Sequence, residues 1–240
     1  MSRRLKMVIL AILLTCAASR AEAGFIDSLL KRLGLTPRTS LSEDRIIAGF
    51  KEALSIGTEN TVKLTGRIDG YFANKAIKIL LPENIAGIEK PLRLLGAGNY
   101  VDSFVLSMNR AAEKAAPYAR SIFLGAVNNI TFEDVRKLLA GGDTAITDFF
   151  RLKTYDALLV TFTPIVDREL ANYSVTAKYK AVVRACQKIP FADKLPLLDV
   201  NRYVATKALD GLFHVLADEE RNIRRNPAAR VTELLKEVFK

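Results

Sequence analysis

The chain has 240 residues, half of them hydrophobic, and a formal net charge of +10 at pH 7. A chain of this length and apolar content can bury a sizeable core, which excludes a mainly disordered protein. The sequence has one histidine and two cysteines, too few for the usual zinc sites. Because no low-complexity tract or Gly/Ser-rich linker divides it, the composition predicts a single domain after the N-terminal segment.

Residues 1–23 are typical of a secretory signal peptide. Basic residues at positions 3, 4 and 6 precede an apolar run over 7–18, and Ala21-Glu22-Ala23 offers small residues for cleavage. The apolar run is shorter than the roughly 20 residues of a membrane-spanning helix. We therefore expect cleavage after Ala23 and an exported, periplasmic domain over residues 24–240.

Cys16 gives an alternative reading of the same segment. Leu13-Leu14-Thr15-Cys16 loosely resembles a lipobox, and processing there would leave a lipoprotein anchored at Cys16. Leu14 and Thr15 fit poorly where small residues are needed, which favours the soluble form. Cleavage after Ala23 also removes Cys16, so that Cys186 would have no partner for an intrachain disulfide.

Apolar residues recur at helical spacing along most of the domain, which predicts an all-α fold. A first amphipathic helix is expected to end at Gly34, and a second to stop near Gly57. Residues 76–79 are the one place where we expect a short extended segment. The next helix is predicted to open at Pro82 and to close at Gly96.

Proline, threonine and aspartate mark the helix ends in the middle of the chain. Pro117 is expected to kink or break an alanine-rich helix. Thr131 with Asp134 matches a capping box, and Asp143 is predicted to cap the following helix. We expect Pro164 to interrupt that helix.

Residues 200–240 predict one long amphipathic helix, capped by Asp199 or Asn201, and a short closing helix opened by Asn226-Pro227. The buried face of the long helix is expected to carry Ala205, Leu209, Leu212, Leu216 and Ile223. Stretches 94–99 and 138–143 resemble each other at a spacing typical of helical hairpins. The predicted fold is a compact multi-helix bundle of stacked helical hairpins.

Three runs carry a resemblance to a known family: SMNRAAEKAAP at 107–117, KALDGLF at 207–213, and EERNIRRNPAARVTELLKEVF at 219–239. With these runs the sequence resembles the domain of unknown function 4197 family over nearly the whole chain after the signal peptide. The resemblance implies an exported, mainly helical domain, and it implies no catalytic residues.

Glu219 and Glu220 break the pattern of the long helix, since both project toward its apolar face. Arg224 lies four residues beyond Glu220, the favourable order for an ion pair, and Arg230 follows the turn. We interpret these four residues as an ion-pair clamp that fixes the angle between the last two helices. A substrate-facing carboxylate is the alternative.

The remaining candidates for chemistry have ordinary structural explanations. His214 has Asp210 and Asp218 four residues to either side, but it lies on the polar face of the helix, where an exposed charge ladder is expected. Asn109 and Glu113 are expected to form a solvated or inter-helix polar pair. No Ser-His-Asp set and no phosphate-binding loop is evident, so the sequence predicts no metal, no cofactor and no enzyme.

Export, helical architecture and apolar richness together favour a binding protein for a hydrophobic ligand. We expect a lipid of the acyl-chain, sterol or hopanoid class, held in a cavity between helices and carried between membranes. The residues expected to line this cavity are Phe104, Met108, Phe123, Phe149, Phe150, Tyr155, Phe162 and Phe213. Plain core packing is the alternative for each of these residues.

Two other functions stay open: an envelope adaptor that binds another protein through a helical face, and, third, a carboxylate-based hydrolase. Without the signal peptide, which carries +3, the net charge of +10 falls to +7. In an exported protein this charge favours contact with an anionic membrane surface rather than nucleic acid, although it also serves solubility.

Overall fold

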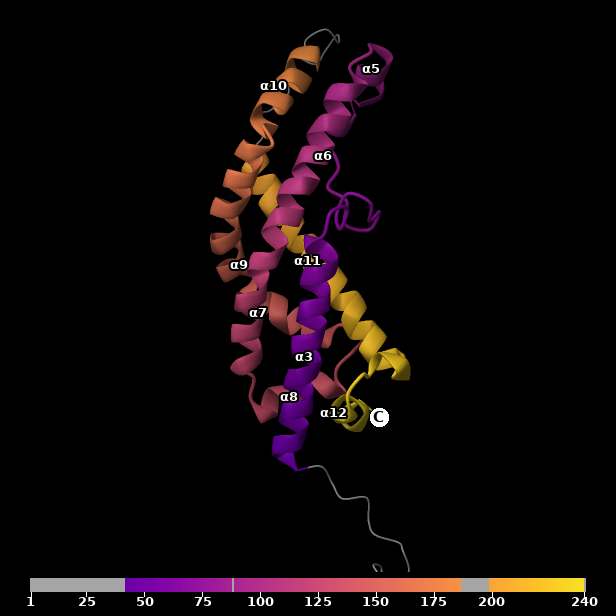
Figure 1. Cartoon of the computed structure of the whole chain (residues 1–240), viewed down its shortest axis with the longest axis vertical. Helices are drawn as coiled ribbons and strands as arrows, with labels where there is room; N and C mark the ends of the chain where they lie inside the picture. The colour runs from indigo at the N-terminus through magenta and orange to yellow at the C-terminus, as the bar shows by residue number, and fades with distance from the viewer. Residues whose placement is uncertain (1–41, 88, 187–198, 240) are drawn as a thin grey trace, which may run out of the picture. The chain divides into compact units, whose positions relative to one another are not determined.

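Helix α11 (Val200–Arg225) lies at the centre of the fold and packs against α3 (Glu43–Gly66), α6 (Gly98–Ala115) and α9 (Ala145–Asn172) (Figure 1). The structure is a computed structural model that describes residues 42–87, 89–186 and 199–239. The other helices in these ranges are α4 (Glu83–Ala86), α5 (Glu89–Leu94), α7 (Ala119–Asn128), α8 (Phe132–Ala140), α10 (Val175–Cys186) and α12 (Glu233–Val238), with 3-10 turns η1 (Ala116–Tyr118) and η3 (Pro227–Ala229). The described ranges contain no strand, which confirms the all-α prediction.

By its internal contacts the chain divides into one unit over residues 1–42 and a second over residues 43–240. The predicted signal peptide, the lipobox at Cys16 and the first predicted helix lie outside the described residues. All helices named above belong to the second unit.

Helix α3 is longer than the sequence predicts. The stop expected near Gly57 is wrong, and the helix continues to Gly66. Its second half lacks a clear apolar repeat because buried threonines take the place of apolar residues. Thr61 and Thr65 donate their hydroxyls to carbonyl oxygens four residues earlier, both at 2.7 Å, so their burial leaves no polar group of the side chain unpaired.

The prolines differ in their effect on the helices. Pro117 ends the α6 helix as predicted, since it lies in the 3-10 turn that follows α6. Pro164, in contrast, lies inside the unbroken helix α9, so the predicted interruption is wrong. Packing of α9 against α6, α7 and α11 offsets the hydrogen bond that a proline removes. Pro82 precedes two short helices rather than one, and Gly96, with φ of 74°, follows the second.

Capping residues account for most of the other helix ends. Thr131 and Asp134 form the predicted capping box, and Asp199 accepts from the backbone N–H of Arg202 at the start of α11. Asn226 caps the 3-10 turn at Pro227. The closing helix α12 begins at Glu233 and not at Pro227, because Thr232 caps it.

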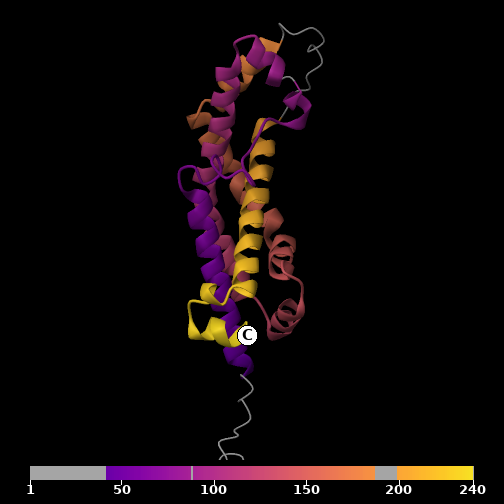
Figure 2. The same cartoon turned by 90° about the vertical axis from the view of Figure 1, so that its right-hand side faces the viewer.

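The closing helix packs on α3, the first described helix (Figure 2). The ring of Phe239 stacks against the ring of Phe50, with centroids 6.4 Å apart, and Leu235 is fully buried. Val231 is 67% exposed and precedes α12.

Candidate binding groove

The eight residues predicted to line a cavity lie in the core, where their side chains pack closely. Six are at most 2% exposed: Phe104, Met108, Phe123, Phe150, Phe162 and Phe213. The ring of Phe123 lies 6.2 Å from that of Phe150 and 5.6 Å from that of Phe213. Phe149 and Tyr155 are half-buried and contact the same cluster, whereas Phe104 contacts Tyr179. These rings occupy the space between their helices, and none of the eight lines the groove described below.

A crossing segment, residues 67–82, connects α3 to α4 and is held by two polar side chains of α6. Asn109 is fully buried; its carboxamide accepts from the N–H of Ile79 and donates to the carbonyl oxygen of Ile79, both at 2.8 Å. Glu113, 3% exposed, accepts from the N–H groups of Tyr71 and Phe72 at 3.1 Å. The expectation of a solvated or inter-helix pair is therefore wrong, because both side chains bind backbone of the crossing segment.

Arg110 completes this anchor. Its guanidinium donates to the Glu113 carboxylate at 2.6 Å and to Asp69 at 2.7 Å. The charge of the buried Glu113 is thus paired, which burial of a carboxylate requires. Asp69 has φ of 64°, a left-handed conformation that turns the chain from α3 into the crossing segment.

The other side of the crossing segment rests on α11. The Tyr71 hydroxyl donates to the carbonyl oxygen of Ala208 at 2.6 Å, and the Tyr203 hydroxyl donates to that of Leu80 at 3.1 Å. Gly211 makes the close approach possible, since a Cβ there would lie 2.5 Å from the Tyr71 ring. Burial raises the pKa of the Tyr203 hydroxyl, so it remains a hydrogen-bond donor at neutral pH.

Between the crossing segment and α11 lies a groove of about 640 Å³ that is open to solvent. Its lining residues are Ala76, Ile77, Lys78, Ile79, Leu80, Leu81, Pro82, Glu83, Tyr203, Lys207, Asp210, Gly211 and His214. One wall is the crossing segment, in which Ala76 and Leu80 are exposed and Ile77, Ile79 and Leu81 are buried; the other is the polar face of α11. An amphiphilic molecule fits such a pair of walls better than a purely apolar or purely ionic one.

Cations predominate among the charged groups of the groove that lack an ion pair. The Asp210 carboxylate pairs with Arg151 of α9, which leaves Glu83 as the other carboxylate of the lining. Lys207 is exposed, and the Lys78 ammonium lies 4.0 Å from the centre of the Phe72 ring. The two ammonium groups give the groove a surplus of positive charge toward an anionic ligand group.

His214 lines the same groove from the exposed face of α11. Its Nε2 lies 3.6 Å from Asp218, and its side chain is 45% exposed. Among the described residues, no group of three His, Cys, Asp or Glu side chains is arranged to hold a metal ion. The sequence pattern identified the helix face of His214 but gave no sign of the groove, because the opposite wall has no helical repeat.

Glu220 and Arg224 bind the corner between α8 and α9. The Glu220 carboxylate accepts from the N–H groups of Ile146 and Thr147 at 3.1 and 2.8 Å and from the Thr147 hydroxyl at 2.8 Å. It pairs with Arg224 at 2.9 Å, and Arg224 donates to the carbonyl oxygen of Leu138 at 2.8 Å. One ion pair thus caps the start of α9 and the end of α8.

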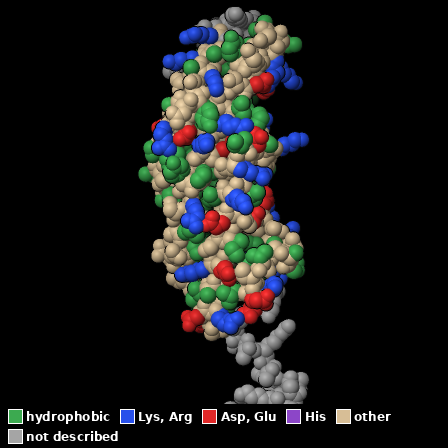
Figure 3. All heavy atoms as spheres, viewed as in Figure 1, with side chains coloured by type: hydrophobic (Ala, Val, Ile, Leu, Met, Phe, Trp, Pro, Cys, Tyr) green, Lys and Arg blue, Asp and Glu red, His purple; other side chains and the backbone are tan. Residues whose placement is uncertain are grey.

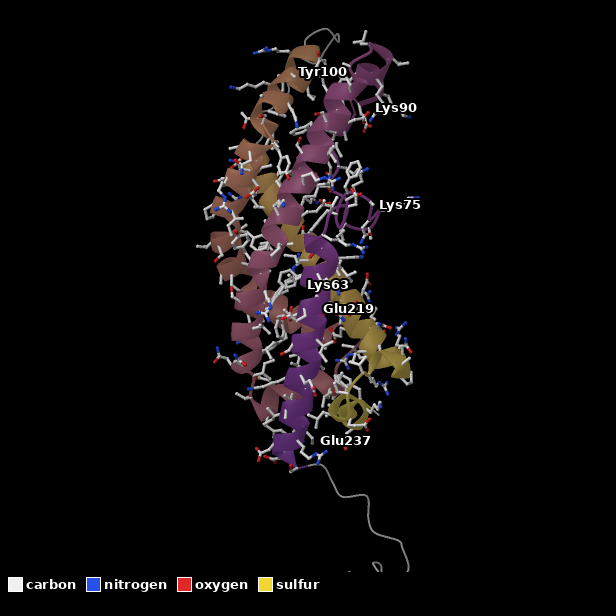
Figure 4. The ribbon with its side chains drawn as sticks, viewed as in Figure 1. Lys63, Lys75, Lys90, Tyr100, Glu219 and Glu237 are labelled. Atoms are coloured by element: carbon white, nitrogen blue, oxygen red, sulfur yellow. The ribbon has the colours of Figure 1, made fainter. Side chains whose placement is uncertain are left out.

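Glu219 and Arg230 have other roles. Glu219 accepts from Asn60 of α3 at 2.9 Å (Figure 4), and Arg230 donates to the carbonyl oxygens of Ile223 and Arg224 at the end of α11. The four residues therefore bind different partners. Asp143, predicted to cap α9, pairs instead with Arg225, and no side-chain cap is present at Thr144.

Among the described residues, no helix combines the length and the apolar character that crossing a membrane requires. No curated protein and no solved structure matches the chain. The sequence model of one family, described as Protein of unknown function (DUF4197), matches residues 40–240. Two of the runs that carry the resemblance meet at the groove, since Asn109 and Glu113 hold one wall and residues 207–213 supply part of the other. The chain belongs to the DUF4197 family.

Proposed function

We propose that the protein binds an amphiphilic ligand of the lipid class, with an apolar chain and an anionic headgroup, in the groove between the crossing segment and α11. We further propose that it does so as an exported protein. The observation that carries the proposal is that the exposed Leu80 lies in one groove with Lys78 and Lys207, which form no salt bridge within the described residues. Its volume of about 640 Å³ lies within the roughly 300–1,000 Å³ of small-molecule sites.

The rigidity of the groove supports the same proposal. Asn109, Tyr71 and Tyr203 fix the crossing segment by hydrogen bonds to backbone groups. A wall that is already ordered loses little conformational entropy when a ligand binds. Leu80, which is 60% exposed between the buried Ile79 and Leu81, offers apolar surface to such a ligand.

The test is native mass spectrometry of protein purified from its own host, followed by lipid extraction. We expect a stoichiometric lipid, and we expect added palmitate to raise the melting temperature of delipidated protein. If neither is seen, and a second protein co-purifies instead, the envelope adaptor replaces this proposal.

Variants locate the site. Leu80→Asp combined with Lys207→Glu should abolish the palmitate-induced rise in melting temperature, because one change makes the apolar wall charged and the other removes a cation. The matched control is Leu152→Asp with Lys63→Glu, two exposed positions on α9 and α3. Equal loss of the palmitate effect in both double variants would contradict the placement of the ligand in the groove.

A further inference from the structure

Three large apolar side chains are exposed where α5 ends and α6 begins. Leu94 is 88% exposed, Leu95 57% and Tyr100 48%; we call these three residues the apolar tip. The end of α10 lies at the same end of the helical unit in both views (Figures 1 and 2). Single exposed apolar residues are normal, but three within seven positions form a patch.

The backbone presents the apolar tip in a fixed orientation. Leu92 is fully buried and anchors α5. The N–H of Ala97 donates to the carbonyl oxygen of Leu92 at 2.9 Å across Gly96, whose φ is 74°. This closing turn directs Leu94 and Leu95 away from the core.

Arg93 connects α5 to α6 by one ion pair and forms a second within α5. Arg93 binds Glu89 at 2.9 Å and Asp102 at 2.5 Å, which also lowers the pKa of the Asp102 carboxyl. The carboxylates of Glu89 and Asp102 therefore share one arginine. The patch is a braced turn and not a loose loop.

The surroundings of the apolar tip are basic. Residues 89–102 contain Lys90 and Arg93 against Glu89 and Asp102, a net charge of zero, and residues 180–186 add Lys180 and Arg184, so the sum is +2. Lys90, Lys180 and Arg184 are exposed. Helix α10 packs along α6, and Figure 3 shows Lys and Arg side chains on both sides of this end of the molecule.

We propose that the apolar tip docks on an anionic lipid bilayer, with Leu94 and Leu95 in the boundary between headgroups and acyl chains. Tyr100 would lie at headgroup level, where aromatic residues with a polar end concentrate. The flanking cations complement anionic headgroups, the combination by which peripheral proteins bind membranes. A protein partner is less well matched, because the apolar area is confined to two leucines and one tyrosine on a turn.

The proposed docking does not depend on the ligand proposed above, but it would place the groove where such a ligand is available. The groove runs along Tyr203 to His214, in the half of α11 on the same side as the apolar tip (Figure 2). Docking would therefore hold the groove near the bilayer from which an amphiphile leaves.

The experiment is co-sedimentation of protein purified from its host with vesicles of phosphatidylglycerol and phosphatidylcholine, and with vesicles of phosphatidylcholine alone. We expect binding to the anionic vesicles that weakens with salt. Leu94→Asp with Leu95→Asp should lower the partition coefficient at least about tenfold. The control Leu152→Asp with Val160→Asp, at positions 82% and 76% exposed on α9, should change it less than about twofold.

Fluorescence supplies a second readout, because the sequence has no tryptophan. The emission of Tyr100→Trp should shift to the blue on anionic vesicles and be quenched by brominated lipid, whereas that of Tyr118→Trp should not. Absence of binding, equal effects of both double variants, or an unshifted Tyr100→Trp spectrum would overturn the proposal. A Leu94→Asp, Leu95→Asp variant that loses a co-purified protein but still binds vesicles would overturn it as well. Native mass spectrometry of the Leu94→Asp, Leu95→Asp variant separates the two proposals, since the groove should still carry its lipid.

Discussion

Two pairs of polar side chains, of which Asn109, Glu113 and Glu220 are buried and Arg224 is partly buried, bind backbone groups and have different effects on the structure. Asn109 and Glu113 on α6 bind a segment of turns that contains neither an α-helix nor a strand. Glu220 and Arg224 on α11 bind the termini of two helices. The first pair shapes a surface groove, whereas the second holds the helical frame. We therefore expect substitutions of Asn109 or Glu113 to weaken ligand binding, and substitutions of Glu220 or Arg224 to lower the stability of the fold.

The largest effect on stability is expected from Glu220→Ala. The change leaves Arg224 without its carboxylate and the N–H groups of Ile146 and Thr147 without an acceptor, which should cost about 3–5 kcal/mol of unfolding free energy. Urea unfolding followed by circular dichroism measures it. Glu219→Ala, which removes a bond to Asn60 at a partly exposed position, is the control and should cost no more than about 1 kcal/mol. Similar losses in the two variants would contradict a special role for Glu220.

Asn109→Ala should lower the free energy of unfolding less than Glu220→Ala does, but it should weaken ligand binding more. It leaves the N–H and the carbonyl of Ile79 buried without partners, a loss of about 2 kcal/mol, and it frees one wall of the groove. We expect faster proteolysis within residues 67–82 and a loss of the palmitate-induced rise in melting temperature. Asn99→Ala, at an exposed position of the same helix, serves as the control. An intact palmitate effect in Asn109→Ala would separate the anchor from the site.

Alanine substitution should change the free energy of unfolding in opposite directions at Gly211, beside the groove, and at Gly57, within α3. In Gly211→Ala the new methyl would lie 2.5 Å from the Tyr71 ring and 3.2 Å from Ile77, so the crossing segment must move, at about 1–3 kcal/mol. In Gly57→Ala the nearest atom would be 4.0 Å away, on Leu216, and the variant should gain about 0.4–1 kcal/mol. Thermal unfolding of both variants makes the comparison, and a stabilised Gly211→Ala would show that the segment is not held tightly against α11.

The smallest effect concerns the acid side of the stability curve. Hydrogen bonds from the Thr131 hydroxyl and backbone lower the pKa of Asp134 in the folded protein. The ionised form therefore favours folding: its contribution is complete above the pKa of the unfolded chain, about 3.9, and it is lost as the pH falls through the folded-state pKa. Asp134→Asn should flatten the pH dependence of the melting temperature below about pH 4. An unchanged acid limb would exclude a contribution from the capping box.

Helical periodicity made the architecture predictable, but not the groove. The stripe on α11 and the box at Thr131 are local patterns, and both are present in the structure. Half of helix α6 is buried, and its buried residues include several alanines together with Asn109 and Glu113. The density of alanine around these two polar residues was the available signal for their burial. The partners of these residues lie 30 to 42 positions away, in a segment with no repeat to reveal it.

Helix α12 packs on α3 through Phe239 and Phe50, and Arg45 near the start of α3 pairs with Glu237 at 2.9 Å. The first described helix therefore makes these contacts with the last one, and 192 positions separate the two residues of the ion pair. The part of α3 that packs against α12 is therefore covered only when α12 docks, whereas α7 and α11 cover other parts of the same helix. Closure through so distant a contact slows folding, because the ends of a long loop must meet before α12 can dock on α3.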